Sequence, residues 1–227
     1  MALIEKLIKE KWLKTPEIIT AFKKINRADF IPEGFRHFSD LNEALLIGYN
    51  QTISQPLVVA FMLELLNPES GDKILDIGSG SGYTSALLAH IVSQKSSSQF
   101  SVSPPKADPP KADNFQTKGK IVAIEIIPEL VEFGRANADK YEFVKKGIIE
   151  FICANGSKGY KKDAPYDAIL ASASGKKIPN EWRKQLKIGG RIVAPIKNSI
   201  WLIEKIGDNE YQETEYPGFV FVPLVIK

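Results

Sequence analysis

Alternating glycines follow an apolar run in the segment ILDIGSGSGY at 74–83. The run ILDI has the composition of a buried strand, and the glycines place a tight turn directly after it. Glycine lets the backbone adopt left-handed conformations and leaves room for a ligand to touch the main chain. In open α/β sheets, ligands bind at the carboxyl ends of the strands, where such a turn lies. The segment therefore predicts a ligand-binding turn; an ordinary strand-to-helix turn of small residues is the alternative.

The spacing of these glycines distinguishes between nucleotide-binding motifs. A dinucleotide fingerprint requires G-x-G-x-x-G, and its third glycine position is Tyr83 in this chain. The chain contains no G-x-x-x-x-G-K-[ST] phosphate loop. The pattern D-x-G-x-G-x-G instead resembles the first motif of the S-adenosylmethionine-dependent methyltransferases. This resemblance implies an S-adenosyl-L-methionine cofactor, held by Asp76, Gly78, Ser79, Gly80 and Gly82.

A glutamate ends a second apolar run, IVAIE at 121–125. A carboxylate in that place can accept hydrogen bonds from both hydroxyls of an adenosine ribose, as in nucleotide-binding α/β folds. Glu125 lies 49 positions after Asp76, against about 20 from the glycine turn in this architecture. When the 26 residues 93–118 are discounted, 23 positions remain. We therefore predict that Glu125 binds the ribose, with Ile126 beside it; an exposed strand-end glutamate is the alternative.

Residues 93–118 do not share the alternation of strands and helices. They are rich in Ser, Pro, Lys and Asp, and they contain PPKAD twice, at 104–108 and 109–113. Such a segment lacks the apolar side chains whose burial offsets the entropy of ordering. We expect a flexible low-complexity insert between a helix and a strand; a proline-rich docking tract is the alternative.

The other apolar patterns predict the elements that must position these residues. Helical spacing favours helices over 3–13, 16–25, 56–66, 83–92, 128–141 and 180–187, and apolar runs favour strands over 73–77, 120–124, 149–153, 168–171 and 191–195. This alternation predicts a parallel α/β sheet covered on both faces. Two further strands, 201–204 and 219–226, are expected to pair antiparallel, and residues 26–50 are expected to be irregular.

The overall composition argues against several classes of function. A chain of 227 residues with 44% hydrophobic residues suits one domain, 1–227, with a helical N-terminal segment 1–50. The net charge of +3 comes from 30 basic and 27 acidic residues without strong clustering, so no nucleic-acid partner is expected. No apolar stretch reaches about 18 residues, and the N-terminus is unlike a signal peptide, so no membrane association is expected. We expect a monomer.

Metal and disulfide chemistry are not expected either. The only cysteine, Cys153, excludes an internal disulfide and fits a reducing compartment, so we expect a cytoplasmic protein. Cys153 ends an apolar run, where an inert core residue is commoner than a nucleophile. The two histidines, His37 and His90, cannot form a metal site with one cysteine at any usual spacing.

A second resemblance concerns the methyl acceptor. The segment GYNQTISQP at 48–56, followed by a predicted helix, resembles a Gln-Thr-Ile-Ser-x-Pro segment of the protein-L-isoaspartate (D-aspartate) O-methyltransferases. Further similar segments are NRADFIP at 26–32, LDIGSGSGY at 75–83, PYDAI at 165–169, QLKIGGR at 185–191 and FVPL at 221–224. The resemblance covers the chain from Asn26 to Leu224 except the insert.

This resemblance implies a Rossmann-like class I methyltransferase fold, with a mostly parallel seven-stranded sheet, helices on both faces and an antiparallel C-terminal strand. It implies methyl transfer from S-adenosyl-L-methionine to the free α-carboxylate of L-isoaspartyl residues, and of D-aspartyl residues as a further candidate, in peptides and damaged proteins. The products are S-adenosyl-L-homocysteine and an ester, which cyclises to a succinimide that reopens partly to aspartate. A carboxylate is already ionised at neutral pH, so alignment of the reactants supplies the catalysis.

The resemblance also assigns roles around the acceptor and the adenine. The Ser54 hydroxyl is expected to donate to the substrate carboxylate and Thr52 to shape the same pocket; capping of the following helix is the alternative for both. The family's Gly-Asp-Gly stands here as Ala154-Asn155-Gly156. Asn155 and Gly156 are therefore expected at the adenine, where Asn155 keeps an acceptor oxygen without the charge.

Two other functions stay open. A related methyltransferase with a different carboxylate or small-molecule acceptor would fit the loop after Pro195, which is shorter than in the family, and Leu46, which stands where proline is common. A cofactor-binding interaction protein without turnover would fit the change at Asn155. The presence of Ser54 and Glu125 argues against this last possibility.

Overall fold

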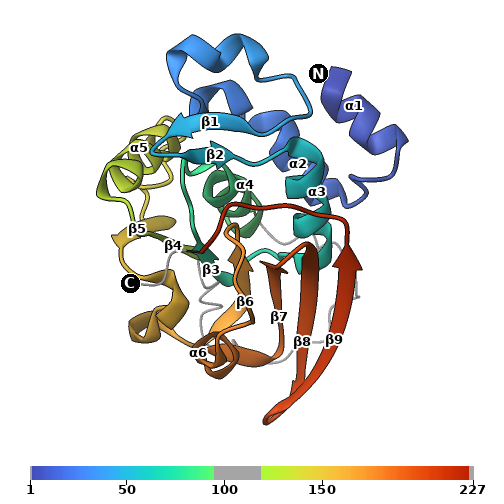
Figure 1. Cartoon of the computed structure of the whole chain (residues 1–227). Helices are drawn as coiled ribbons and strands as arrows, with labels where there is room; N and C mark the ends of the chain where they lie inside the picture. The colour runs from blue at the N-terminus through green and yellow to red at the C-terminus, as the bar shows by residue number, and fades with distance from the viewer. Residues whose placement is uncertain (1, 95–118, 225–227) are drawn as a thin grey trace, which may run out of the picture.

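The computed structural model describes residues 2–94 and 119–224. The chain begins with α1 (Ala2–Lys9), α2 (Pro16–Lys24) and the 3-10 helices η1 (Arg27–Phe30) and η2 (Glu33–Phe38). A hairpin of β1 (Leu45–Gly48) and β2 (Gln51–Ile53) follows and leads into α3 (Pro56–Leu66). In Figure 1 this hairpin lies above the upper ends of the main sheet, beside the N-terminal helices.

Seven strands form the main sheet in the order β5-β4-β3-β6-β7-β8-β9. The first five strands in this order are parallel, whereas β8 runs antiparallel to both β7 and β9. This confirms the predicted mostly parallel seven-stranded sheet. The strand bounds are β3 (Lys73–Ile77), β4 (Lys120–Glu125), β5 (Ile149–Cys153), β6 (Tyr166–Ala171), β7 (Leu186–Ile196), β8 (Ser199–Gly207) and β9 (Glu210–Pro217).

Alternate residues of the central strands enter two apolar cores. Ile74 of β3 and Ala123 of β4 face a core shared with α2 and α3, and with α4 (Tyr83–Val92) and α5 (Pro128–Asp139). Leu75 and Val122 face the opposite core, which includes the buried Trp182 of α6 (Asn180–Lys184). Burial on both faces explains why these strands read as continuous apolar runs in the sequence.

The expected strand over 219–226 is wrong. Residues 219–224 form no regular strand, and Pro223 makes only an isolated bridge with Ser174, while 225–226 lie outside the described residues. Proline has no amide to donate to a sheet. The last strand among the described residues is instead β9, EYQETEYP, at the edge of the sheet. The sequence pattern did not predict β9 because its side chains are mostly polar, and an edge strand need not be apolar.

Several boundaries also differ from the sequence patterns. Residues 26–50 hold two 3-10 helices and β1 rather than irregular chain alone. The first helix ends at Lys9, before Lys11, whose φ of +63° is left-handed. Helices α5 and α6 end at Asp139 and Lys184, earlier than predicted. The insert predicted at 93–118 lies outside the described residues except for Ser93 and Gln94. Among the described helices, none is long and apolar enough to cross a membrane.

Candidate active site

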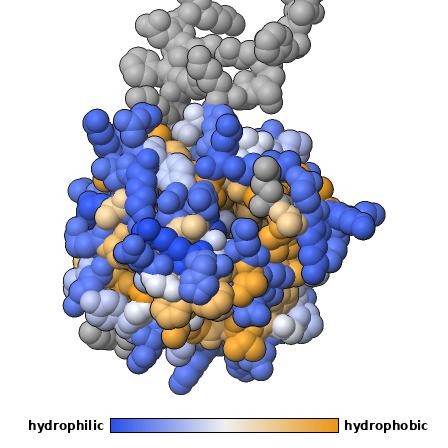
Figure 2. Space-filling view, turned by 90° about the horizontal axis from the view of Figure 1, so that it is seen from above, coloured by the Kyte–Doolittle hydropathy of each residue, from blue (hydrophilic) through white to orange (hydrophobic). Residues whose placement is uncertain are grey.

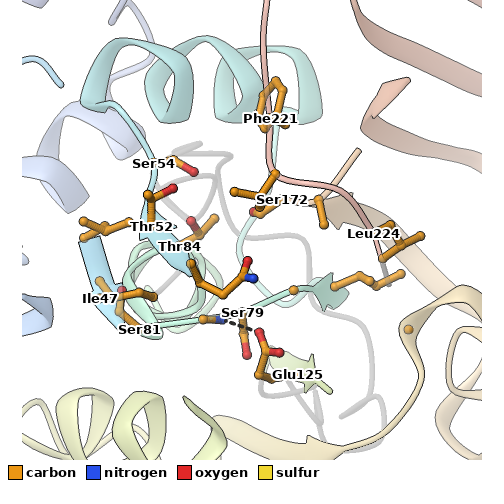
Figure 3. A pocket seen from close by; sticks show the side chains of 18 of the residues that line it. Ile47, Thr52, Ser54, Ser79, Ser81, Thr84, Glu125, Ser172, Phe221 and Leu224 are labelled. Carbon is orange, nitrogen blue, oxygen red and sulfur yellow. Dashed lines mark hydrogen bonds between the residues drawn. The ribbon is translucent and has the colours of Figure 1, made fainter. Parts of the chain in front are cut away.

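A cavity of about 370 Å³ lies at the carboxyl ends of β3, β4 and β6. The glycine turn after β3 and Glu125 form one wall, and residues 51–55 form a second. Residues 220–224, which cross the upper ends of the strands in Figure 1, form a third. In Figure 3, Ser54 and Thr52 point into the cavity, and Ser79 and Glu125 lie on another side of it. One cavity therefore holds both predicted acceptor residues and most of the predicted cofactor residues, namely Gly78, Ser79, Gly80, Glu125, Ile126 and Gly156; Asp76, Gly82 and Asn155 do not line it.

Left-handed glycines shape the turn. Gly78, Gly80 and Gly82 have φ angles of +77°, +50° and +83°. The amides of Gly78 and Ser79 both donate to the carbonyl oxygen of Ile124 in β4, at 2.8 and 3.0 Å. Gly82 does not line the cavity but packs on α5, where a Cβ added to it would lie 2.8 Å from the carbonyl oxygen of Gly134. The turn is thus held between β4 and α5.

Glu125 is buried at the edge of the cavity, with 6% of its surface exposed, so the alternative of an exposed strand-end glutamate is wrong. Oε2 accepts a hydrogen bond from the Gly80 amide at 3.0 Å (dashed in Figure 3). Oε1 accepts from the amides of Ile126 and Ile127 at 2.7 and 3.0 Å. Because a carboxylate oxygen can accept two hydrogen bonds, Oε2 keeps capacity for a ligand hydroxyl. Ile126 also lines the cavity.

Asp76 lies behind the cavity wall. It is fully buried; Oδ2 accepts from the Ser85 hydroxyl at 2.5 Å, and Oδ1 has no hydrogen-bond partner in the part of the chain that the structure describes. Burial raises the pKa of Asp76 to about 6; the Ser85 hydrogen bond opposes this increase and the Glu125 charge adds to it. Ser79 lines the cavity, and its buried hydroxyl also has no hydrogen-bond partner among the described residues. Unpaired buried polar atoms beside the turn suit a polar ligand.

The ionisation of Asp76 predicts a pH dependence of stability. Its pKa is about 6 in the folded protein against 3.8 for the free side chain, so the folded state binds more protons within that window. The free energy of unfolding therefore falls as the pH rises through the window. Relative to Asp76→Asn, which cannot ionise, we expect the ligand-free protein to lose about 2 kcal/mol between pH 4 and pH 7. Urea unfolding of both proteins at the two pH values measures this; a pH-independent difference between them would contradict it.

The hydroxyls of Ser54 and Thr52 have no hydrogen-bond partner among the described residues, and both residues line the cavity. Helix α3 begins at Pro56, and its N-cap residue Gln55 makes no side-chain cap. The Leu57 amide instead donates to Oδ1 of Asn42, at 2.9 Å. Since Asn42 provides the cap, the capping alternative for Ser54 and Thr52 is wrong, and both hydroxyls are available to a ligand.

The segment Ala154-Asn155-Gly156 follows β5 at the side of the cavity. Ala154 and Gly156 line it, whereas Asn155 Oδ1 accepts from the Ser157 amide and hydroxyl, at 3.0 and 2.7 Å, and caps the short helix η4 (Gly156–Lys158). The Trp182 indole donates to the Gly156 carbonyl oxygen at 2.8 Å. A Cβ on Gly156 would lie 2.4 Å from Ile77 Cγ2, so only glycine fits there. The adenine-side roles of Asn155 and Gly156 stay predictions.

Two features of the site were not evident from the sequence. Residues 220–224 line the cavity instead of extending the sheet; Pro223, which disfavours a strand interior, was the available signal. Arg27 is buried behind Ser54 and donates to its carbonyl oxygen at 3.2 Å. Because Arg27 binds carbonyl groups, no acidic residue is paired with it in the sequence; the available signal was its position in the segment NRADFIP at 26–32, which resembles the family.

Comparison with known proteins agrees with this arrangement. The model of the family "Protein-L-isoaspartate(D-aspartate) O-methyltransferase (PCMT)" matches residues 1–103 and 111–227. A protein-L-isoaspartate O-methyltransferase of Methanopyrus kandleri is 34% identical, with 98% of this chain and 89% of the relative covered. Protein-L-isoaspartate O-methyltransferase 2 of Archaeoglobus fulgidus is 36% identical, with coverage of 92% and 84%.

The fold has a close counterpart among solved structures. A Plasmodium falciparum protein described as a putative protein-L-isoaspartate O-methyltransferase, in complex with S-adenosyl-L-homocysteine, aligns with a TM-score of 0.80. The alignment covers 99% of this chain and 97% of that one at 21% identity, so it establishes the likeness of the class I methyltransferase fold. The family model and the sequence relatives together cover nearly the whole chain. This chain belongs to the protein-L-isoaspartate O-methyltransferase family.

Proposed function

We propose that this protein transfers a methyl group from S-adenosyl-L-methionine to the free α-carboxylate of L-isoaspartyl residues in peptides and damaged proteins. One observation carries the proposal: Ser54, in the segment that resembles the family, faces the same cavity as the glycine turn and Glu125. D-aspartyl residues are a second proposed acceptor, because the matching family model names both. The single cysteine supports a reducing, cytoplasmic compartment, and we propose that the protein acts there as a monomer.

The wall around the glycine turn fits this cofactor. The buried Ser79 hydroxyl lacks a partner among the residues that the structure describes, and Glu125 Oε2 can accept a further hydroxyl. When bound, the cofactor supplies a methyl group on a positively charged sulfur to an oxygen nucleophile. The residues that we propose for binding share the wall or support it: Gly78, Ser79 and Gly80 at the turn, Glu125 and Ile126 at the ribose, Asn155 and Gly156 at the adenine, and Asp76 and Gly82 behind the turn.

The protein's own contribution to the reaction is positioning. Ser54 donates its hydroxyl to one oxygen of the acceptor carboxylate and thereby orients the other toward the cofactor side of the cavity. Thr52 bounds the same end. The carboxylate is ionised at neutral pH, so no side chain has to remove a proton. Ile47, Phe221 and Leu224 give the cavity apolar walls, which limit water around the reacting groups.

Exposed apolar side chains on the elements around the cavity favour a polypeptide acceptor. Leu46 and Tyr49 of the hairpin region and Val220 of the C-terminal segment are 56%, 55% and 87% exposed. Figure 2 shows apolar patches among charged side chains on the face seen from above. Apolar patches of this kind mark interaction surfaces, and they offer contacts to residues that flank an isoaspartyl group. A free small carboxylate would leave them unused.

Replacement of Ser54 tests the acceptor role directly. In Ser54→Ala we expect kcat/KM for an isoaspartyl peptide to fall about 30-fold, because a hydrogen bond to a charged acceptor contributes about 2 kcal/mol. The affinity for S-adenosyl-L-homocysteine should not change. Ser199→Ala is the control, since its hydroxyl donates to Glu215 at 2.7 Å outside the cavity. Unchanged kcat/KM in a stable Ser54→Ala protein would remove the proposed role.

The proposed reaction is tested with labelled S-adenosyl-L-methionine and three acceptors: an isoaspartyl peptide, its aspartyl twin and a small dicarboxylate. We expect a labelled methyl ester on the isoaspartyl peptide alone. Methylation of the dicarboxylate alone would support the related methyltransferase instead. Cofactor binding without transfer to any acceptor would support an interaction protein without turnover.

A further inference from the structure

Arg27 is a buried arginine that holds the segment before α3 in place. It is 6% exposed. One terminal nitrogen donates to the carbonyl oxygens of Ser39 and Leu41, at 3.0 and 3.3 Å. The other donates to those of Glu43 and Ser54, at 2.7 and 3.2 Å. Four carbonyl groups between residues 39 and 54 thus converge on one guanidinium, which fixes the backbone of Ser54.

The guanidinium carries a charge that the described residues do not neutralise by contact. Its hydrogen bonds all go to carbonyl groups, and no described carboxylate lies within ion-pair distance. Its Nε has no hydrogen-bond partner within residues 2–94 and 119–224. Burial lowers the pKa of Arg27, and interactions with Tyr83 and Asp40 oppose the decrease. Arginine nevertheless remains protonated in proteins, and a buried charge without a counter-ion is costly.

This charge lies directly behind the acceptor end of the cavity. Ser54 binds the guanidinium through its carbonyl oxygen and faces the cavity on its other side. Tyr83 also lines the cavity; burial raises the pKa of Tyr83, and the Arg27 charge opposes this increase, so the two groups are neighbours. Glu125 is on the opposite, cofactor side. The cavity therefore has a positive end at Ser54 and a negative end at the glycine turn.

We propose that Arg27 is a positioning and specificity-determining residue, whose buried charge makes the acceptor end select an ionised carboxylate over a neutral group of the same shape. The inference rests on the proposed function, in which the acceptor is an isoaspartyl α-carboxylate. A charge within a protein interior acts over several ångströms with little screening. Arg27 thus attracts the carboxylate through the Ser54 segment while its hydrogen bonds hold Ser54 in place.

Two peptides of the same shape separate charge from structure: an isoaspartyl peptide and its twin with a carboxamide in place of the α-carboxylate. The Kd of each is measured calorimetrically with protein saturated with S-adenosyl-L-homocysteine, so that no turnover occurs. We expect wild type to prefer the carboxylate and Arg27→Gln to reduce this preference about tenfold. Arg27→Lys keeps the positive charge but loses the planar donor geometry of the guanidinium. It should therefore weaken the binding of both peptides equally and keep the preference for the carboxylate.

Arg135→Gln is the control. Arg135 lies on α5, outside the cavity, and like Arg27 it donates to a backbone carbonyl oxygen, that of Phe151, at 3.1 Å. It should keep the wild-type preference. A folded Arg27→Gln protein with an undiminished preference would overturn the proposal. If Arg27→Gln does not fold, the Arg27→Lys variant provides the test. Loss of the carboxylate preference in that variant, which keeps the positive charge, would also overturn the proposal. Failure of wild type to bind either peptide would instead refute the proposed function, and this inference with it.

Discussion

Replacing Glu125 by alanine is expected to weaken the binding of S-adenosyl-L-homocysteine about 100-fold. The Glu125 carboxylate accepts hydrogen bonds from the amides of Gly80, Ile126 and Ile127. Its removal leaves three partly buried backbone donors without an acceptor and also removes the proposed partner of the ribose. Hydrogen bonds to a charged group contribute about 1.5 to 3 kcal/mol, and a loss of about 2.7 kcal/mol corresponds to 100-fold in Kd. Titration calorimetry measures the change.

Two further variants test whether the loss of affinity comes from the Glu125 carboxylate itself. Glu125→Gln keeps the shape, but its amide nitrogen would face a backbone donor, so we expect a weakening of about tenfold. Glu150→Gln is the control: Glu150 lies on the adjacent strand β5 and pairs with Lys120 at 2.7 Å, away from the cavity. Its affinity should equal that of wild type. A wild-type affinity in Glu125→Ala would show that Glu125 does not bind the cofactor.

Gly82→Ala is expected to lower the free energy of unfolding by about 3 kcal/mol. Two costs combine: a left-handed backbone for a residue with a Cβ costs about 1 kcal/mol, and overpacking in a rigid region costs about 1 to 3 kcal/mol. Gly82 has a φ of +83°, and its added Cβ would lie 2.8 Å from the carbonyl oxygen of Gly134 and 3.1 Å from its Cα. Both are backbone atoms, so no side chain can move aside.

Gly189→Ala separates the two costs. Gly189 has nearly the same φ, +82°, and nothing lies within 4 Å of its added Cβ. We therefore expect a loss of about 1 kcal/mol, which represents the backbone conformation alone. Urea denaturation of both variants provides the comparison. Equal losses would mean that α5 does not confine the glycine turn.

The parts of the fold that the sequence predicts are those with uniform surroundings. Strands β3 and β4 are buried on both faces, so they read as apolar runs. The β1–β2 hairpin was missed because its strands are short and its turn is Tyr49-Asn50, with φ of +53° and +56°. Such a turn is ordinarily signalled by glycine in one of these positions.

Some residues of the candidate site could be predicted from the sequence and others could not. Glu125 could be predicted from spacing because β3 and β4 are parallel neighbours in register, with Ile77 opposite Ile124, so a residue ending β4 lies beside the turn after β3. Arg27 and Gly134 could not be predicted, because both act through backbone atoms of distant segments. Contacts to carbonyl groups impose no residue type on the partner and therefore leave no pattern in the sequence.

The most direct test of the proposed repair function follows one isoaspartyl peptide over time by reversed-phase chromatography, which separates it from its aspartyl twin. The protein is supplied with S-adenosyl-L-methionine in one reaction and without it in the other. We expect the isoaspartyl form to decline and the succinimide and aspartyl forms to rise only when the cofactor is present. An isoaspartyl peptide that stays unchanged, with cofactor binding verified in the same sample, would contradict the function proposed for this protein.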